Sequence, residues 1–309
     1  GESTTEVSEA FRKTVSSLEG SVAIVANSAV APEKLTLALR GSGQGLYVGL
    51  AEDAFVIASE PYGLVETTNE YLRMNGESIE SRKNLVSGPG EIITLSLDNA
   101  GSLEGVERIS YDGTPLPIED KEVVKAEITT RDIDRRGFPH FLLKEIFEAP
   151  ESFRKTLRGN LFKKGEDLRV VLTEEEFPSS LTKKLDRSEI NKIYVIGQGT
   201  AAVAGQALSR YLNEETRIPT EDLPATELSG FRLSVDMSNV LVIAISQSGT
   251  TTDTNRTVDL ARTRGACVIS IVNRRNSELA QKSEGVIYTS DGRDIEMSVA
   301  STKAFYSQV

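Results

Sequence analysis

The residues of this chain best suited to bind a ligand are seven consecutive polar or glycine residues, Ser246 to Thr252, directly after an apolar run that ends at Ile245. The pattern predicts a buried strand, a polar turn and then a helix. The first backbone N–H groups of a helix have no partner within the helix and carry the positive end of its dipole. Hydroxyl groups add neutral donors, so such a turn can bind phosphate without lysine or arginine.

The alternative interpretation of this turn is a Ser/Thr N-cap without any ligand, as in most single Ser–Gly turns. The length of the polar run favours a ligand. Gln247 can donate its amide N–H to an oxyanion or a sugar hydroxyl. Asp253 falls in the first turn of the expected helix, where we interpret it as a partner of the helix dipole.

Two further segments follow expected strand ends and add polar groups. In residues 197–201 (GQGTA) the glycines allow close backbone approach, and Thr200 can cap the next helix. This segment resembles half of a dinucleotide fingerprint, but it lacks the third glycine in register, which argues against a nicotinamide cofactor. In residues 296–303, Ser301 can bind hydroxyls and Lys303 is a cation near the expected phosphate, although alone this is an ordinary N-cap and helix.

The elements that position these segments are predicted from the alternation of strands and helices after Lys192. Apolar strands over 192–197, 239–246, 266–273 and 285–290 alternate with helical patterns. Continuous apolar strands between helices predict a parallel sheet that is buried on both faces. Ligands of such sheets bind beyond the carboxyl ends of the strands, so the three polar segments are expected to line one pocket.

The first 130 residues have a different pattern. Residues 1–19 repeat apolar side chains at helical spacing, and short β-rich runs separated by turns then follow. This predicts a layered domain dominated by antiparallel sheet. The runs 21–27 and 54–60 are apolar on both faces and are expected to be strands covered on each side.

The middle of the chain is predicted to be a linker followed by helices. Residues 120–137 are charged and lack periodicity. A helix is expected from Phe138, with a break at Pro150 as the first residue of a second helix, and a short helix over 179–187. His140 is expected to be a packed structural residue. Lys144 and Glu145 are expected to be solvated or paired across helices.

Composition restricts the class of protein. The 309 residues suffice for two domains, and 46 acidic against 35 basic residues argue against a nucleic-acid or acidic-membrane partner. The sequence has no apolar run near the roughly 20 residues that span a bilayer and no signal peptide, so we expect a cytoplasmic protein. Cys267 is the only cysteine and is expected to be a core thiol. With one histidine, no metal site is expected.

Five segments together resemble one enzyme family. They are SQSGTTTDT (246–254), GQGT (197–200), VASTKAF (299–305), GFPHFLLKEIFEAPES (137–152) and the β-rich run over 37–60. They resemble glutamine–fructose-6-phosphate aminotransferase, also called glucosamine-6-phosphate synthase, whose sugar isomerase (SIS) domains bind fructose 6-phosphate. The resemblance implies an α/β fold, with a partial class II glutaminase domain (αββα layers) over 1–120 and a linker over 121–140. It further implies a helical segment over 141–186 and the first SIS domain, a three-layer parallel-sheet fold, over 187–309.

The resemblance also implies the ligand site. By motif position, the phosphate would be held by Thr200, Ser246, Gln247, Ser248 and Thr251, and the sugar site would be lined by Val299 and Ser301. The family's first strand turn reads CGTS, whereas this chain has Ala201 in place of the serine. The lost hydroxyl donor to a charged group costs on the order of 1.5–3 kcal/mol, which weakens binding or changes the preferred substrate.

The implied function is part of an amidotransferase that converts fructose 6-phosphate and glutamine to glucosamine 6-phosphate and glutamate. The family's N-terminal Cys nucleophile and second SIS domain do not occur in this sequence, so no catalytic residue is assigned and no cofactor is expected. The chain is expected to be a fragment that binds a sugar phosphate and forms a homodimer through SIS domains. Two alternatives stay open: a non-catalytic phosphosugar-binding or regulatory module, and an SIS-type deaminase or isomerase of another phosphosugar.

Overall fold

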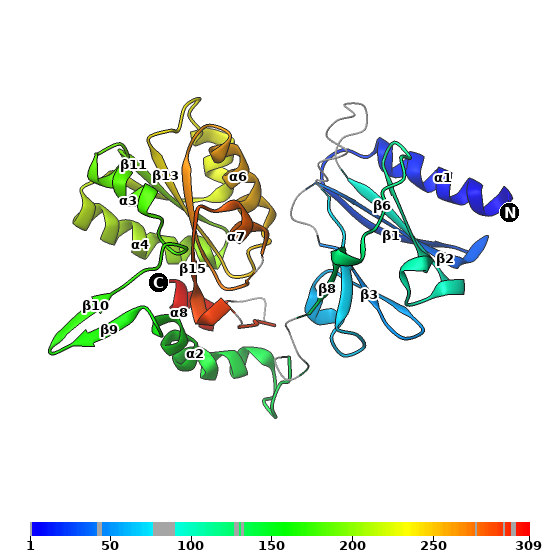
Figure 1. The fold of residues 1–309 in the computed structure, drawn as a ribbon, viewed down its shortest axis with the longest axis horizontal. Helices are drawn as coiled ribbons and strands as arrows, with labels where there is room; N and C mark the ends of the chain where they lie inside the picture. The colour runs from blue at the N-terminus through cyan, green and yellow to red at the C-terminus, as the bar shows by residue number, and fades with distance from the viewer. Residues whose placement is uncertain are drawn as a thin grey trace. The chain divides into compact units, whose positions relative to one another are not determined.

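The computed structural model divides the chain into two compact units, Gly1–Ile133 and Asp134–Val309, drawn in Figure 1. The boundary falls inside the stretch predicted to be a linker. The structure describes residues 2–41, 45–76, 90–126, 130, 133–275, 277–292, 294–297 and 301–309.

The first unit consists of a helix and two antiparallel sheets. Helix α1 spans Glu2–Ser17. One sheet has the order β1-β2-β6-β7, formed by Val22–Ser28, Ala31–Arg40, Glu91–Ser96 and Val106–Ser110. The other has the order β4-β3-β5-β8, formed by Phe55–Ala58, Tyr47–Leu50, Glu70–Arg73 and Val123–Lys125.

Side chains on alternate faces of the central strands β2 and β6 form much of the core of this unit. Because successive side chains of a strand point to opposite faces, Leu37 and Leu39 of β2 pack with Val48 of β3 between the sheets. Ala38, between those two leucines, belongs instead to a cluster with Val15 of α1. The unit therefore has a helix, a sheet and a second sheet in successive layers.

The two strands predicted to be covered on both sides are edge strands in the structure. The runs 21–27 and 54–60 form β1 and β4, which are the edge strands of their sheets, and Val25 of β1 is 44% exposed. The strands buried on both faces are β2 and β6. Part of the stretch predicted to be a linker is a strand, since Val123–Lys125 forms β8 and pairs with β5.

The second unit is built on a parallel sheet in the order β12-β11-β13-β14-β15. These strands are Thr220–Pro224, Lys192–Gly197, Val240–Ser246, Cys267–Val272 and Gly285–Tyr288. The helices that follow or precede them are α3 (Ser179–Asp186), α4 (Thr200–Thr216), α5 (Ala225–Glu227), α6 (Thr252–Arg262) and α7 (Glu278–Lys282). The predicted α/β layering with a parallel sheet is confirmed.

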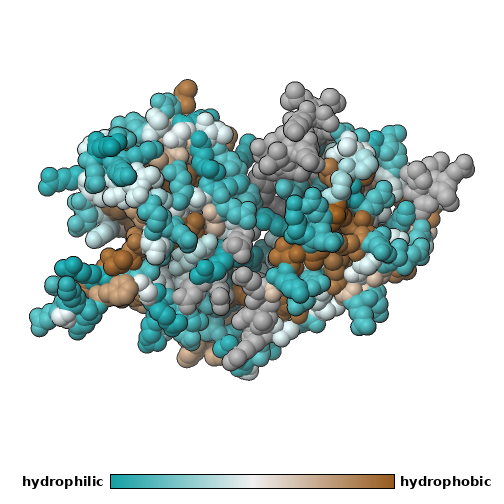
Figure 2. Space-filling model, in the orientation of Figure 1, coloured by the Kyte–Doolittle hydropathy of each residue, from teal (hydrophilic) through white to brown (hydrophobic). Residues whose placement is uncertain are grey.

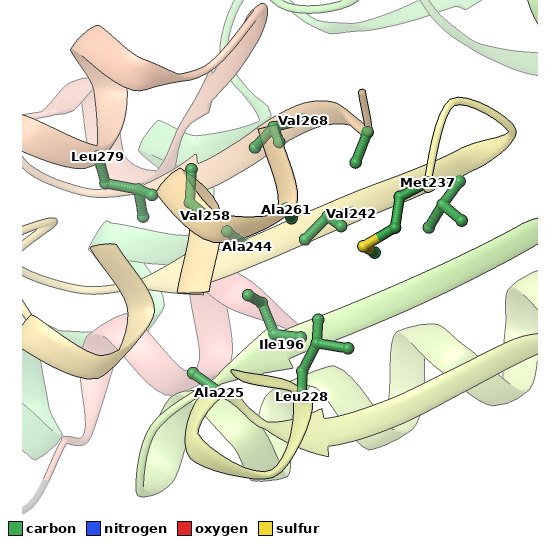
Figure 3. Close-up of a cluster of buried hydrophobic side chains, with 12 residues drawn as sticks. Ile196, Ala225, Leu228, Met237, Val242, Ala244, Val258, Ala261, Val268 and Leu279 are labelled. Atoms are coloured by element: carbon green, nitrogen blue, oxygen red, sulfur yellow. The ribbon is translucent and has the colours of Figure 1, made fainter. Parts of the chain in front are cut away.

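Every residue of β13 is buried, since helices cover both faces of the sheet. On one face, Val242 and Ala244 pack with Val258 of α6 and Leu279 of α7, as Figure 3 shows. On the other face, Ile243 packs in a cluster that includes residues of α3 and α4. Cys267 lies in this second cluster, as the sequence predicted for a core thiol.

Helix α2 (Phe141–Leu157) is continuous, so the predicted break at Pro150 was wrong. A proline inside a helix removes one N–H, yet α2 runs through Pro150 and packs against α8 (Lys303–Gln308). The hydroxyls of Ser152 and Ser307 lie 3.0 Å apart between the two helices. A hairpin that the sequence did not predict, β9 (Leu161–Lys164) and β10 (Asp167–Val170), follows α2.

Several apolar side chains of α2 are exposed to solvent, while some of its polar side chains are buried. Phe147 is 68% exposed, whereas Lys144 and Glu145 are buried. Figure 2 shows brown, hydrophobic atoms at the surface of each unit. In the part of the chain that the structure describes, every helix is too short or too polar to cross a membrane.

Candidate functional site

A cavity of about 300 Å³ lies at the carboxyl edge of the parallel sheet, and all three polar segments contribute to its lining. Six of the seven predicted site residues line it: Thr200, Ser246, Gln247, Ser248, Thr251 and Ser301. The seventh, Val299, lies outside the described residues. The structure thus brings together segments that are up to about 100 residues apart in the sequence.

The turn after β13 owes its shape to Gly249. This residue has a φ of 66°, which favours glycine, and an added Cβ would lie 2.2 Å from Ser277 Oγ. Its carbonyl accepts hydrogen bonds from Leu279 N at 3.0 Å and Asn255 Nδ2 at 3.1 Å. The turn is therefore held from α6 and α7 before any ligand binds.

Hydrogen bonds within the turn set the direction of its hydroxyl groups. Ser248 Oγ accepts from Thr250 N at 3.2 Å and from Thr250 Oγ1 at 2.9 Å. Ser246 Oγ accepts from Gly249 N at 3.0 Å. Because Ser248 Oγ is the acceptor in both of its bonds, its own hydrogen is free to donate elsewhere. The turn therefore offers donors, which are the groups that an anion needs.

The start of α6 argues against the alternative interpretation that the turn serves only as an N-cap. Thr251 occupies the N-cap position, but its side chain makes no capping hydrogen bond. Its hydroxyl lies 3.4 Å from Ser246 Oγ instead. Asp253 is in the first turn of the helix, as predicted for a partner of the helix dipole.

The turn after β11 opens α4 toward the same cavity. Gly199, with a φ of 57°, is the N-cap, and Thr200 is the first helical residue. The prediction that the Thr200 hydroxyl caps this helix was therefore wrong. Gly197 allows the strand and helix to approach closely, since an added Cβ would lie 2.7 Å from the backbone of Ala201.

The third segment is organised by Glu296, which lines the cavity and to which the sequence assigned no role. Its Oε1 accepts from Thr302 N at 2.9 Å and Ala304 N at 3.0 Å, and its Oε2 accepts from Ser301 Oγ at 2.8 Å. The Ser301 hydrogen is thereby occupied, so this hydroxyl presents acceptor lone pairs. The cavity thus has donors at the 246–251 turn and an acceptor at Ser301.

Lys303 does not provide the cation that the sequence suggested for this site. It is buried, and its Nζ lies 2.7 Å from Glu148 Oε2 on α2. Neither lysine nor arginine occurs among the described lining residues. Any anion bound here is held by neutral donors and by the N-terminal ends of α4 and α6.

Helix α2 supports the third segment through buried polar groups. Glu145 is buried rather than solvated, and its Oε1 accepts from Met297 N at 2.6 Å. Lys144 Nζ lies 3.7 Å from Glu148. His140 has a structural role, because its Nδ1 caps α2 by accepting from Leu143 N at 3.2 Å. It is exposed rather than packed as predicted. Among the described residues, no group of three His, Cys, Asp or Glu side chains is arranged to hold a metal ion.

Two lining residues that the sequence analysis did not assign are Gln198, after β11, and Gln308, at the end of α8. Gln198 stands in the glycine turn that was already singled out. Gln308 is one helical turn beyond the buried Ala304, so helical spacing places the two on the same face of α8.

The fold and the cavity define the class of the second unit. Residues 188–309 match the family model of the SIS domain. This chain therefore carries a SIS domain, and its cavity lies at the strand ends of that domain.

Relatives extend the similarity to nearly the whole chain. It is 33% identical to glutamine–fructose-6-phosphate aminotransferase (isomerizing) of Chlorobaculum tepidum over 302 residues, which is 97% of this chain and 43% of that protein. It is 32% identical to the enzyme of the same name from Thermus thermophilus, over 96% of this chain and 43% of that protein. The resemblance predicted from the motifs is confirmed, and the chain spans less than half the length of these relatives.

A solved structure described as the C-terminal domain of glucosamine-fructose-6-phosphate aminotransferase from Francisella tularensis is 28% identical in sequence. It aligns with a TM-score of 0.45 over 57% of this chain and 46% of that chain.

Proposed function

We propose that the second unit binds a hexose phosphate, with fructose 6-phosphate as its ligand. The observation that carries this proposal is the Ser248 hydroxyl at the 246–251 turn, whose oxygen accepts from Thr250 and whose hydrogen remains to be donated. Thr200, Gln247 and Thr251 supply further donors in the same cavity. Neutral donors at two helix N-termini suit a phosphate dianion.

The sugar would extend from the phosphate toward the third segment. Ser301 offers an acceptor because its hydrogen is bonded to Glu296, and a sugar hydroxyl can donate to it. We assign the backbone of Val299 to this part of the site by its position in the VASTKAF motif. Ala201 contributes no hydroxyl, so the affinity for phosphate is expected to be lower than with serine at this position.

We further propose that the chain is part of an enzyme that transfers glutamine-derived ammonia to fructose 6-phosphate and isomerises the product. The similarity to the named aminotransferases over 97% of the chain supports this. By the same similarity, the first unit would be the later part of a class II glutaminase domain, and the protein would form a homodimer through SIS domains. The 309 residues alone would bind the sugar phosphate without making glucosamine 6-phosphate.

Calorimetric titration tests the proposed ligand. The chain should bind fructose 6-phosphate and inorganic phosphate but not fructose, since the phosphate supplies the charge that the turn recognises. The same ligands should raise the melting temperature, because a ligand that binds only the folded state stabilises it. Absence of heat and of a melting shift with every hexose phosphate at millimolar concentration would refute the proposal.

A second candidate function is a non-catalytic phosphosugar-binding or regulatory module, which Ala201 favours. Both functions predict binding, so they are separated by the gene. A reading frame that extends upstream to an N-terminal Cys-Gly and downstream to a second SIS domain supports the enzyme. A frame without these parts supports the binding module.

A further inference from the structure

Two glutamine side chains in the cavity have a buried polar atom without a hydrogen-bond partner among the described residues. They are the Oε1 atom of Gln198 and the Nε2 atom of Gln308. The Gln308 side chain belongs to a residue that is only 4% exposed. Buried polar atoms in folded proteins nearly always have a partner, which indicates that a ligand completes these two.

The two atoms require opposite partners, which restricts the ligand group. An amide oxygen accepts hydrogen bonds, and an amide nitrogen donates them. An ionised phosphate has acceptor oxygens only, so it can satisfy Gln308 but not Gln198. A hydroxyl group both donates and accepts, and a sugar carries several of them.

We infer that Gln198 and Gln308 recognise hydroxyl groups of the sugar and determine specificity for a polyhydroxylated phosphate ester. This inference rests on the proposed function and deepens it, because it separates a phosphate-binding part of the cavity from a sugar-binding part. Ser301, whose lone pairs can accept from a sugar hydroxyl, belongs to the sugar-binding part with the two glutamines.

The positions of both glutamines are fixed by structure outside the cavity. Gln308 is on α8, which is joined to α2 by the Lys303–Glu148 ion pair at 2.7 Å and by the contact between Ser152 and Ser307. Gln198 follows the buried strand β11. A side chain held by a rigid element can select among ligands, because it loses little conformational freedom on binding.

The test compares two ligands on variants that remove the amide but keep the side-chain length. Gln308→Met and Gln198→Met are titrated by calorimetry with fructose 6-phosphate and with inorganic phosphate, and melting temperatures report whether each variant folds. Gln206→Met, at an exposed position of α4, is the matched control. Each cavity variant should weaken fructose 6-phosphate binding on the order of tenfold, as expected for one lost hydrogen bond. Affinity for inorganic phosphate should stay within about twofold of the unaltered chain, because that ligand lacks the sugar hydroxyls that the two amides are inferred to recognise.

Three results would overturn the inference. An equal loss for both ligands in both variants would place the glutamines in the phosphate-binding part, and no loss for either ligand would make them structural only. If the unaltered chain bound neither ligand, the proposed function itself would fail, and the inference with it. If one variant does not fold, the other decides, because the two glutamines are on separate elements.

Discussion

Replacing Ser248 by alanine removes the hydroxyl that is most clearly oriented toward a bound anion. Its oxygen accepts from the N–H and the hydroxyl of Thr250, so its hydrogen is available to a phosphate oxygen. A hydrogen bond to a charged group contributes about 1.5–3 kcal/mol. At 1.4 kcal/mol per tenfold, the Kd for fructose 6-phosphate should rise roughly 10- to 150-fold.

The same substitution should leave the fold intact. Ser248 and Thr250 are only partly buried, so water can replace the lost acceptor, and the cost in unfolding free energy should stay within about 0.5–1.5 kcal/mol. The assay is calorimetric titration with fructose 6-phosphate and inorganic phosphate, with exposed Ser234→Ala as the control. Because Ser248 is assigned to the phosphate, both ligands should lose affinity together. A Kd for both ligands within about twofold of the unaltered chain would refute the assignment.

Three further predictions concern stability. Burial raises the pKa of Glu91 from 4.5 to about 7, so the contribution of Glu91 to stability is fully present below pH 4.5 and is lost as the pH rises through 7. At 1.36 kcal/mol per pKa unit, the lost free energy of unfolding is about 3 kcal/mol. Glu91→Gln should abolish this loss when urea unfolding is compared at pH 5 and pH 8. A pH dependence unchanged by the substitution would contradict the prediction. In urea unfolding at pH 7, Glu148→Gln should destabilise the protein by about 3 kcal/mol or more, because it leaves Lys303 buried without its carboxylate. Lys303→Met should destabilise it less. The reverse order would contradict the ion-pair assignment. An alanine in the left-handed conformation costs about 1–2 kcal/mol. Gly249→Ala should lower the free energy of unfolding by more than this, since the alanine Cβ would also clash with Ser277. Wild-type stability in the same unfolding assay would show that this turn is not fixed.

The convergence of the three polar segments could be predicted because it follows from topology. Apolar runs between helical patterns predict a parallel sheet, and parallel strands bring their carboxyl ends to one edge. The turns at 197–201 and 246–252 could therefore be placed together without any knowledge of side-chain packing. The residue types in those turns then predicted the neutral donors.

Contacts between residues far apart in the sequence could not be predicted. Lys303 was interpreted as a cation for the ligand, but it pairs with Glu148, which is 155 positions away. Glu296 satisfies the start of α8 in place of a local N-cap, and no local pattern identifies that role. The predictions of a helix break at Pro150 and of covered strands at the sheet edges were wrong for the same reason. Contacts in the tertiary fold outweighed the local sequence preference.

The central claim is that hydroxyls and backbone amides at the 246–251 turn capture the phosphate of a hexose phosphate. A crystal structure of the chain with fructose 6-phosphate tests it most directly. We expect phosphate oxygens within hydrogen-bond distance of Ser246 and Ser248, with the sugar extending toward Ser301. Density for the phosphate away from this turn, or a cavity without ligand at saturating concentration, would refute the assignment.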